Sequence, residues 1–306
     1  MHMATNTERS SPRYTGIDSW QPSDILDAML EGQFAAVGAV HAARPALERA
    51  ALAIEEQLAG GGRLIYAGAG TSGRLAVQDG AELMPTFSWP RDRLILLLAG
   101  GEAAMVRAVE GAEDEIEEAA RLAEHHRIGD KDVLIAVAAS GTTPFTLACL
   151  REGNDRGALT VGIANNRDTP ILGEADHPVW LDTGAEPIAG STRMKAGTAQ
   201  RIALTLLSTL VMIRLGHVYE GLMVDLQAVN AKLIKRSEGI LTQLTGRSRE
   251  AVHDALARTR GNVKAALLVL EGCDPGEAAQ LLDRAGGHLR AAKDLARSQR
   301  PAKSRA

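Results

Sequence analysis

Short apolar runs recur along the first two thirds of the chain, at residues 64–67, 94–99, 133–138, 160–163 and 179–181. Each run is apolar throughout rather than alternating with polar residues, which is typical of strands covered on both faces in a parallel sheet. Helical stretches separate the runs. This order predicts an α/β fold with a doubly wound, parallel five-stranded sheet flanked by helices.

Helical patterns lie on either side of these runs. Residues 22–58 carry apolar side chains at the spacing of one helix face, and the glycines at 60–62 end that pattern. Residues 192–215 contain no proline and only one glycine, Gly197, so we expect a long helix there. The sheet is therefore expected to have helices before it and a long helix after it.

The chain changes character after Gly239. Short helical stretches follow, divided by turn residues at 245–246, 261–262, 274–275 and 286–287, which predicts a small all-helical domain. The predicted organisation is an irregular segment over 1–20, a sheet domain with N-terminal helices over 21–239, the helical domain over 240–298, and a basic, solvated tail over 299–306.

Composition and charge exclude several classes of function. The 306 residues are 45% hydrophobic, and the net charge of -4 argues against nucleic acid as a partner. The longest apolar segments are broken by Arg201, Arg214 or Gly100, well short of the length of a membrane span, and the N-terminus lacks a secretion pattern, so we expect no membrane association. Cys149 and Cys273 are expected to be buried thiols, which places the protein in the cytoplasm.

A glycine-rich loop follows the first predicted strand. Residues 68–73 read Gly-Ala-Gly-Thr-Ser-Gly, which has the glycine spacing of a dinucleotide site. Such a site also needs an acidic residue at the tip of the second strand, whereas that strand ends in Leu98-Ala99-Gly100-Gly101. A nicotinamide cofactor is therefore not expected, although Glu102 follows closely and keeps this alternative open.

The hydroxyl side chains of two loops indicate a phosphate site instead. Thr71 and Ser72 lie where a helix begins, and the free N–H groups of a helix start attract phosphate. A second loop of this kind, after the third strand, contains Ser140, Gly141 and Thr142. Each loop alone also fits a simple helix cap, but both follow parallel strands, and ligands of such sheets bind at the carboxyl ends. With a negative net charge, dipoles and hydroxyls must hold the anion.

Further motifs occur along nearly the whole chain, at residues 7–9, 17–18, 68–75, 81–82, 85–87, 108–114, 139–144, 190–200, 223–225 and 230–233. Together they resemble the N-acetylmuramic acid 6-phosphate etherases of the sugar isomerase (SIS) family. Two segments depart from that family: residues 81–85 read Ala-Glu-Leu-Met-Pro where Ser-Glu-Cys-Pro-Pro is usual, and residues 19–23 are unusual.

The resemblance implies an activity in cell-wall sugar recycling. Such enzymes remove D-lactate from C3 of the phosphosugar by elimination and then add water, with no metal or cofactor, as homodimers. An acid and a base are needed, each contributing about 10²–10⁴-fold in rate. Family correspondence places the base at C2 on Glu113, and the acid toward lactate, later the base toward water, on Glu82.

The residues alone would not select these two carboxylates. Glu113 lies in a run of acidic residues that is typical of a solvated helix face. Glu82 lies between Ala81 and Leu83, a partly apolar setting that favours the protonated form of a carboxyl group. Lys195 either contacts the sugar or its phosphate or lies on a helix surface.

Weaker candidates complete the list. Glu186, which precedes a proline, is a weaker site residue than Lys195, and Asp225 and Asn230 fall in matching motifs without a role. Residues 261–266 resemble part of a ubiquitin-associated three-helix module, for which we expect packing against a subunit or capping of the active site.

Two other functions fit the same loops. One is a non-catalytic sugar-phosphate sensor similar to the glucokinase regulatory protein, which is about twice as long and carries two such domains. The other is an aldose–ketose isomerase, which would share the proton transfer at C2 but release no lactate. A measurement of lactate separates the three functions.

Overall fold

The structure is a computed structural model that describes residues 6–226 and 231–299, without the side chains of Ala231 and Lys232. The predictions for Asn230, for residues 1–5 and for the tail residues 300–306 lie outside the described residues. The chain divides into two compact units, one of Met1–Glu82 and Pro90–Val211, the other of Leu83–Trp89 and Met212–Ala306.

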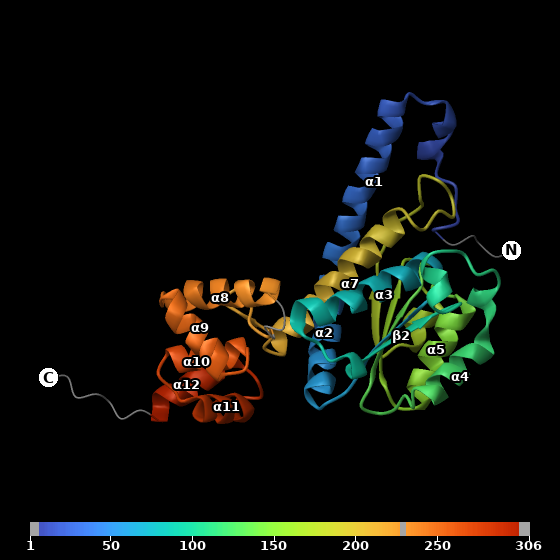
Figure 1. The fold of residues 1–306 in the computed structure, drawn as a ribbon. Helices are drawn as coiled ribbons and strands as arrows, with labels where there is room; N and C mark the ends of the chain where they lie inside the picture. The colour runs from blue at the N-terminus through green and yellow to red at the C-terminus, as the bar shows by residue number, and fades with distance from the viewer. Residues whose placement is uncertain (1–5, 227–230, 300–306) are drawn as a thin grey trace. The chain divides into compact units, whose positions relative to one another are not determined.

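A parallel five-stranded sheet forms the centre of the first unit (Figure 1). Its strands are β1 (Leu64–Gly68), β2 (Leu94–Leu98), β3 (Val133–Val137), β4 (Leu159–Ala164) and β5 (His177–Trp180). They lie in the order β2-β1-β3-β4-β5. Every residue of β1 and β3 is buried, as the unbroken apolar runs predicted. The predicted doubly wound α/β fold is confirmed, with strand ends that differ from the prediction by at most two residues.

Helices cover both faces of this sheet. One face packs against α4 (Ile116–His125), α5 (Pro144–Asp155) and α6 (Pro170–Glu174). The other face packs against α2 (Arg44–Ala59) and α3 (Gly70–Phe87). On that second face Gly80 of α3 lies against Tyr66, and a Cβ there would stand 2.8 Å from Leu96 Cδ2. Close contact between α3 and the sheet therefore depends on glycine.

The helical pattern over 22–58 is interrupted in the structure. It forms α1 (Pro22–Ala42) and α2, which meet at Ala43. Pro45 explains the break, because proline has no N–H to donate to the carbonyl four residues earlier and its ring clashes with that carbonyl. Short 3₁₀ turns precede α1 or connect the elements of the sheet: η1 (Pro12–Tyr14), η2 (Ile17–Ser19), η3 (Arg91–Arg93), η4 (Glu102–Met105) and η5 (Ala112–Asp114).

The predicted long helix is α7 (Lys195–Arg214). By length and composition alone it could cross a membrane, so the expectation that no apolar segment reaches that length is wrong. However, 56% of the most apolar 18-residue stretch of this helix is buried inside the structure, as in the core helix of a soluble protein.

The second unit contains a hairpin and short helices. They are β6 (Val218–Tyr219), β7 (Leu222–Met223), α8 (Ala231–Thr245), α9 (Arg249–Arg258), α10 (Val263–Leu270), α11 (Pro275–Arg284) and α12 (Leu289–Gln299). Side chains of Ser248, Asn262 and Asp274 accept N–H bonds at the starts of α9, α10 and α11, so the predicted turns do separate helices. Helix α8 continues through Gly239, where the change of composition suggested a domain boundary.

Asp225 connects parts of this second unit. Lys264 Nζ of α10 donates to Asp225 Oδ2 at 2.9 Å and to the carbonyl of Gly287 at 2.9 Å. His217 Nδ1 lies 2.8 Å from the same carboxylate oxygen. Burial alone would raise the pKa of Asp225, but His217 and Lys264 outweigh it and hold the pKa below its ordinary value. This motif residue thus has a structural role.

Candidate functional site

The loops after β1 and β3 meet at the point where the strand order reverses. From β1 the chain continues to one edge of the sheet, and from β3 it continues to the other, so these two loops are neighbours. A cavity of about 490 Å³ opens there. Thr71 and Ser72 line it from the first loop, and Ser140 and Thr142 from the second. The structure therefore brings together the hydroxyl side chains that the sequence selected.

The first loop is tight because glycines pack against each other. A Cβ on Gly68 would lie 2.7 Å from Gly73 Cα, so the end of β1 and the first turn of α3 can approach only without side chains. Ser72 is buried, and neither its hydroxyl nor that of Thr71 bonds to another described residue. Both hydroxyls are therefore available to a ligand, beside the N–H groups at the start of α3.

The second loop is organised by Ser140. Its Oγ accepts the N–H of Thr142 at 3.2 Å and lies 3.1 Å from Thr143 Oγ1. Thr143 is the N-cap of α5 but makes no side-chain cap bond, so these hydroxyls are not simple helix caps. Gly141 has a φ of 73°, and a side chain there would collide with Thr169. It shapes the loop without lining the cavity.

The N-terminal segment closes one side of the cavity, a feature that sequence reasoning missed. Thr7 is buried, its N–H donates to Asn166 Oδ1 at 3.2 Å, and Asn166 Nδ2 donates to Thr7 Oγ1 at 2.9 Å and to the Ala139 carbonyl at 3.2 Å. The Thr7 carbonyl accepts the N–H of Gly190 at 2.9 Å. These bonds place Glu8 at the cavity, and the only sequence signal for it was the family motif at residues 7–9.

Among the described residues, three carboxylates line this cavity, those of Glu8, Glu113 and Asp114, and no lysine or arginine does. Glu113 lies in η5, before α4 begins, and so is not on the solvated face of α4 where the acidic run suggested it could be. An anion in this cavity would be held by hydroxyls and by the N–H groups at the starts of α3 and α5, as the negative net charge indicated.

Glu82 does not line the cavity of its own chain. It comes ten residues after Ser72 in α3, which corresponds to about 15 Å along the helix axis. Its side chain is exposed. The partly apolar setting expected from its neighbours is therefore absent, because only Leu83 is buried while Ala81 faces solvent.

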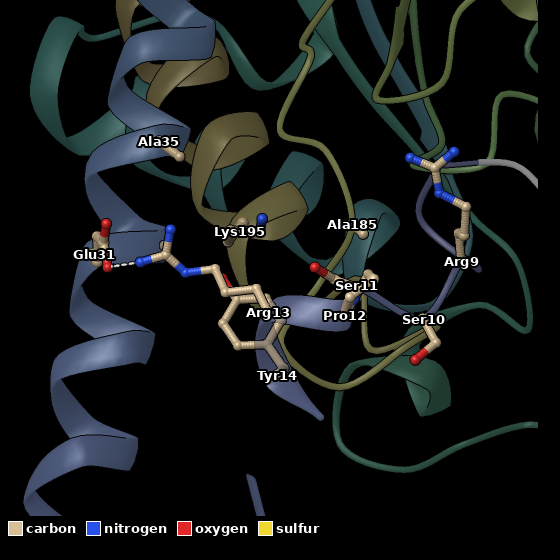
Figure 2. A pocket seen from close by; sticks show the side chains of 11 residues that line it. Arg9, Ser10, Ser11, Pro12, Arg13, Tyr14, Glu31, Ala35, Ala185 and Lys195 are labelled. Atoms are coloured by element: carbon tan, nitrogen blue, oxygen red, sulfur yellow. Dashed lines mark hydrogen bonds and ion pairs between the residues drawn. The ribbon is translucent and has the colours of Figure 1, made fainter. Parts of the chain in front are cut away.

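Lys195 lies at a second cavity, of about 650 Å³, formed by α1, the N-terminal segment and the start of α7 (Figure 2). Only 5% of Lys195 is exposed, so it is not a helix-surface lysine. Burial lowers the pKa of its ammonium group, more than Glu186 nearby raises it. Glu186 itself is buried and accepts the N–H groups of Lys195 and Ala196, at 3.0 and 2.9 Å, so it caps α7.

Comparisons with known proteins identify related families. A model described as the glucokinase regulatory protein N-terminal SIS domain matches residues 47–154, and one described as the SIS domain matches residues 113–210.

Full-length relatives are more informative. An N-acetylmuramic acid 6-phosphate etherase of Deinococcus radiodurans is 52% identical over 285 residues, which cover 93% of this chain and 93% of the relative. Etherases of Streptomyces avermitilis and Mycolicibacterium smegmatis are 45% and 41% identical, over 94% of this chain and over 92% and 97% of their own lengths. The similarity therefore extends over both compact units.

Proposed function

The chain belongs to the N-acetylmuramic acid 6-phosphate etherase family, and on this premise we propose that it cleaves the lactyl ether of that sugar phosphate. The products are D-lactate and N-acetylglucosamine 6-phosphate. The observation that carries the proposal is the cavity at the carboxyl edge of the sheet, where two hydroxyl-rich loops and Glu113 meet. An anionic sugar phosphate fits the paired helix starts there.

The proposed reaction is an elimination followed by a hydration. The open-chain sugar has an aldehyde at C1, which acidifies the proton on C2. A base removes this proton, the C3–O bond breaks, and lactate leaves after taking a proton from an acid. Water then adds to C3 of the unsaturated aldehyde while C2 takes back a proton from the protonated base, which restores a hydroxyl group at C3 and a hydrogen at C2. One water is consumed for each lactate released.

Glu113 is the proposed base at C2. It lines the cavity beside both phosphate loops, within the same chain. Glu82 is the proposed acid toward lactate and base toward water, as the family correspondence suggests. Because Glu82 lies about 15 Å along α3 from Ser72, it does not share a cavity with Glu113 of its own chain.

We propose that a second copy of the chain supplies Glu82, in a homodimer. The surface of α1 supports this, because Leu26, Leu30, Phe34 and Val37 form an exposed apolar stripe along one side of the helix. Phe34 is 76% exposed. An apolar stripe of this kind on a monomer is typical of a protein–protein interface.

Isotope exchange and lactate release together test the two glutamates. The wild-type protein should release D-lactate, with or without a chelator, and incorporate deuterium from solvent at C2. Glu113→Gln should lose both activities, because the base is gone. Glu82→Ala should release almost no lactate but still exchange the C2 hydrogen, because base and aldehyde remain. Each lost role should cost about 10²–10⁴-fold in its own step.

The controls are acidic residues in the same run as Glu113. Glu110→Gln and Glu117→Gln change the same run of charges without touching the cavity and should leave both rates unchanged. If exchange survives in Glu113→Gln and disappears in Glu82→Ala, the roles are reversed. If the wild type releases no lactate, the sugar-phosphate sensor or the isomerase replaces the etherase.

We infer that the protein works in the cytoplasm. Cys149 and Cys273 are both buried thiols outside any disulfide, which suits a reducing compartment.

A further inference from the structure

The second cavity contains a buried cation that no described carboxylate pairs with directly, although Glu186 and Asp182 lie near enough to raise its pKa. Lys195 Nζ makes no hydrogen bond or ion pair with any described residue, although the side chain is almost fully buried. A buried charge is costly unless it is paired, so an unpaired ammonium group at the wall of a cavity indicates a site for an anion.

The neighbouring side chains favour a small anion at Lys195. Arg13 also lines this cavity and pairs with Glu31 of α1, so its charge is already compensated (Figure 2). Arg9 lines the same cavity, but Figure 2 shows its guanidinium on the other side of the view, away from Lys195. Lys195 is thus the cation of this cavity with no direct partner among the described residues, and Glu186 and Asp182 offset its burial only in part.

Packing fixes the position of this lysine. Its aliphatic stem lies against Gly32 of α1, where an added Cβ would be 3.0 Å from Lys195 Cδ. Its backbone N–H is held by Glu186 at the first turn of α7. Because both the backbone and the stem of Lys195 are held in place, its ammonium group has a defined position at the cavity wall.

The two cavities are close together. Glu8 lines the phosphate cavity and Arg9 the second one, and adjacent Cα atoms are about 3.8 Å apart. Likewise Thr192 lines the first cavity, three residues before Lys195.

The substrate of the proposed function carries two anions, a phosphate on C6 and a carboxylate on the lactyl group at C3. About eight single bonds of roughly 1.5 Å separate them, so they span at most about 10 Å.

We propose that the second cavity binds the carboxylate of the lactyl group, with Lys195 Nζ as its cationic partner. This inference rests on the proposed function, since it assigns the second anion of the same substrate. The phosphate loops recognise any 6-phosphosugar, whereas Lys195 distinguishes the lactyl ether from a sugar with a free hydroxyl at C3. Lys195 is then a specificity residue for the substrate and does not take part in holding the phosphate.

Kinetics of Lys195→Met test the proposal. Methionine keeps the packing against Gly32 and removes an unpaired buried charge, so the variant should fold. Its KM for N-acetylmuramic acid 6-phosphate should rise about 10- to 100-fold, the usual loss for a hydrogen bond between charged groups. Inhibition by N-acetylglucosamine 6-phosphate, which has the phosphate but no lactyl group, should be unchanged. Inhibition by D-lactate should be lost.

A matched control is Arg193→Met, which removes an exposed cation two residues away that lines neither cavity. Its KM should equal that of the wild type. The proposal is overturned if Lys195→Met keeps its KM, if it loses affinity for N-acetylglucosamine 6-phosphate to the same extent, or if Arg193→Met has an equal effect. Each of these outcomes differs from failure of the proposed function, in which the wild type itself releases no D-lactate.

Discussion

Ser72 and Ser140 occupy corresponding phosphate loops but have different hydrogen-bonding surroundings. The Ser72 hydroxyl bonds to no other described residue, whereas Ser140 Oγ accepts the N–H of Thr142 and contacts Thr143. In the proposed site the Ser72 hydroxyl would therefore bind the ligand alone, whereas the Ser140 hydroxyl would also stabilise its loop. Substitution separates these two contributions.

Ser72→Ala should weaken binding of N-acetylglucosamine 6-phosphate by about 10- to 100-fold, because a hydrogen bond to phosphate contributes about 1.5–3 kcal/mol. The free energy of unfolding should hardly change. Ser140→Ala should lose similar affinity and also about 0.5–1.5 kcal/mol of stability, since the Thr142 N–H loses its acceptor. Titration calorimetry and urea unfolding measure the two quantities.

The control for this pair is Ser208→Ala on α7, whose hydroxyl bonds to the Thr205 carbonyl and lines neither cavity. It should bind the phosphosugar normally. Normal binding by both Ser72→Ala and Ser140→Ala would contradict the phosphate site.

At the scale of elements, burial decided which parts could be predicted. Strands such as β1 and β3 are buried on both faces, so their apolar runs identify them from local sequence alone. The glycine and hydroxyl loops are local as well. The break between α1 and α2 has only Pro45 as its signal, within an otherwise continuous helical pattern.

The parts of the site that the sequence did not predict depend on distant contacts. The bond between Thr7 and Asn166 joins positions 159 residues apart, and no local pattern contains it. Nor does a local pattern indicate that these bonds bring Glu8 to the cavity, or that Lys195 is buried against Gly32. Periodicity indicates which face of an element is buried but not which other element covers it.

Asp225 links the ends of the hairpin, α10 and the turn before α12. The stability that these contacts give to the second unit depends on pH. Because its folded pKa is lowered, Asp225 stabilises the fold above its unfolded pKa, and this contribution is lost as the pH falls through the folded value. At neutral pH, Asp225→Asn should cost about 1–3 kcal/mol, since Lys264 is left buried without a charged partner.

Urea unfolding of the wild type and of Asp225→Asn at several pH values measures this contribution. The difference in free energy of unfolding should be largest at neutral pH and should vanish once Asp225 is protonated in the folded wild type. Asp254→Asn, on the exposed surface of α9, is the control and should show no such pH dependence. A difference that is the same at every pH would contradict the role of the charge.

At the scale of the whole molecule, the proposed homodimer takes the acid and the base from different copies of the chain. Glu113 lines the cavity of its own chain, and Glu82 is exposed elsewhere on α3. In a symmetric dimer each site would then combine Glu113 of one subunit with Glu82 of the other. A heterodimer of two inactive variants distinguishes this arrangement from a site built within one chain.

Glu82→Ala and Glu113→Gln should complement each other when they are co-expressed with different tags and the heterodimer is purified through both. One of its two sites then contains an intact Glu82 and an intact Glu113, while the other site lacks both. The heterodimer should therefore release D-lactate at about half the wild-type rate. The control is Glu113→Gln expressed with both tags and purified in the same way. It should stay inactive, which excludes activity that arises from exchange of subunits. An inactive heterodimer, or a chain that is monomeric in light scattering yet fully active, would mean that both carboxylates act within one chain.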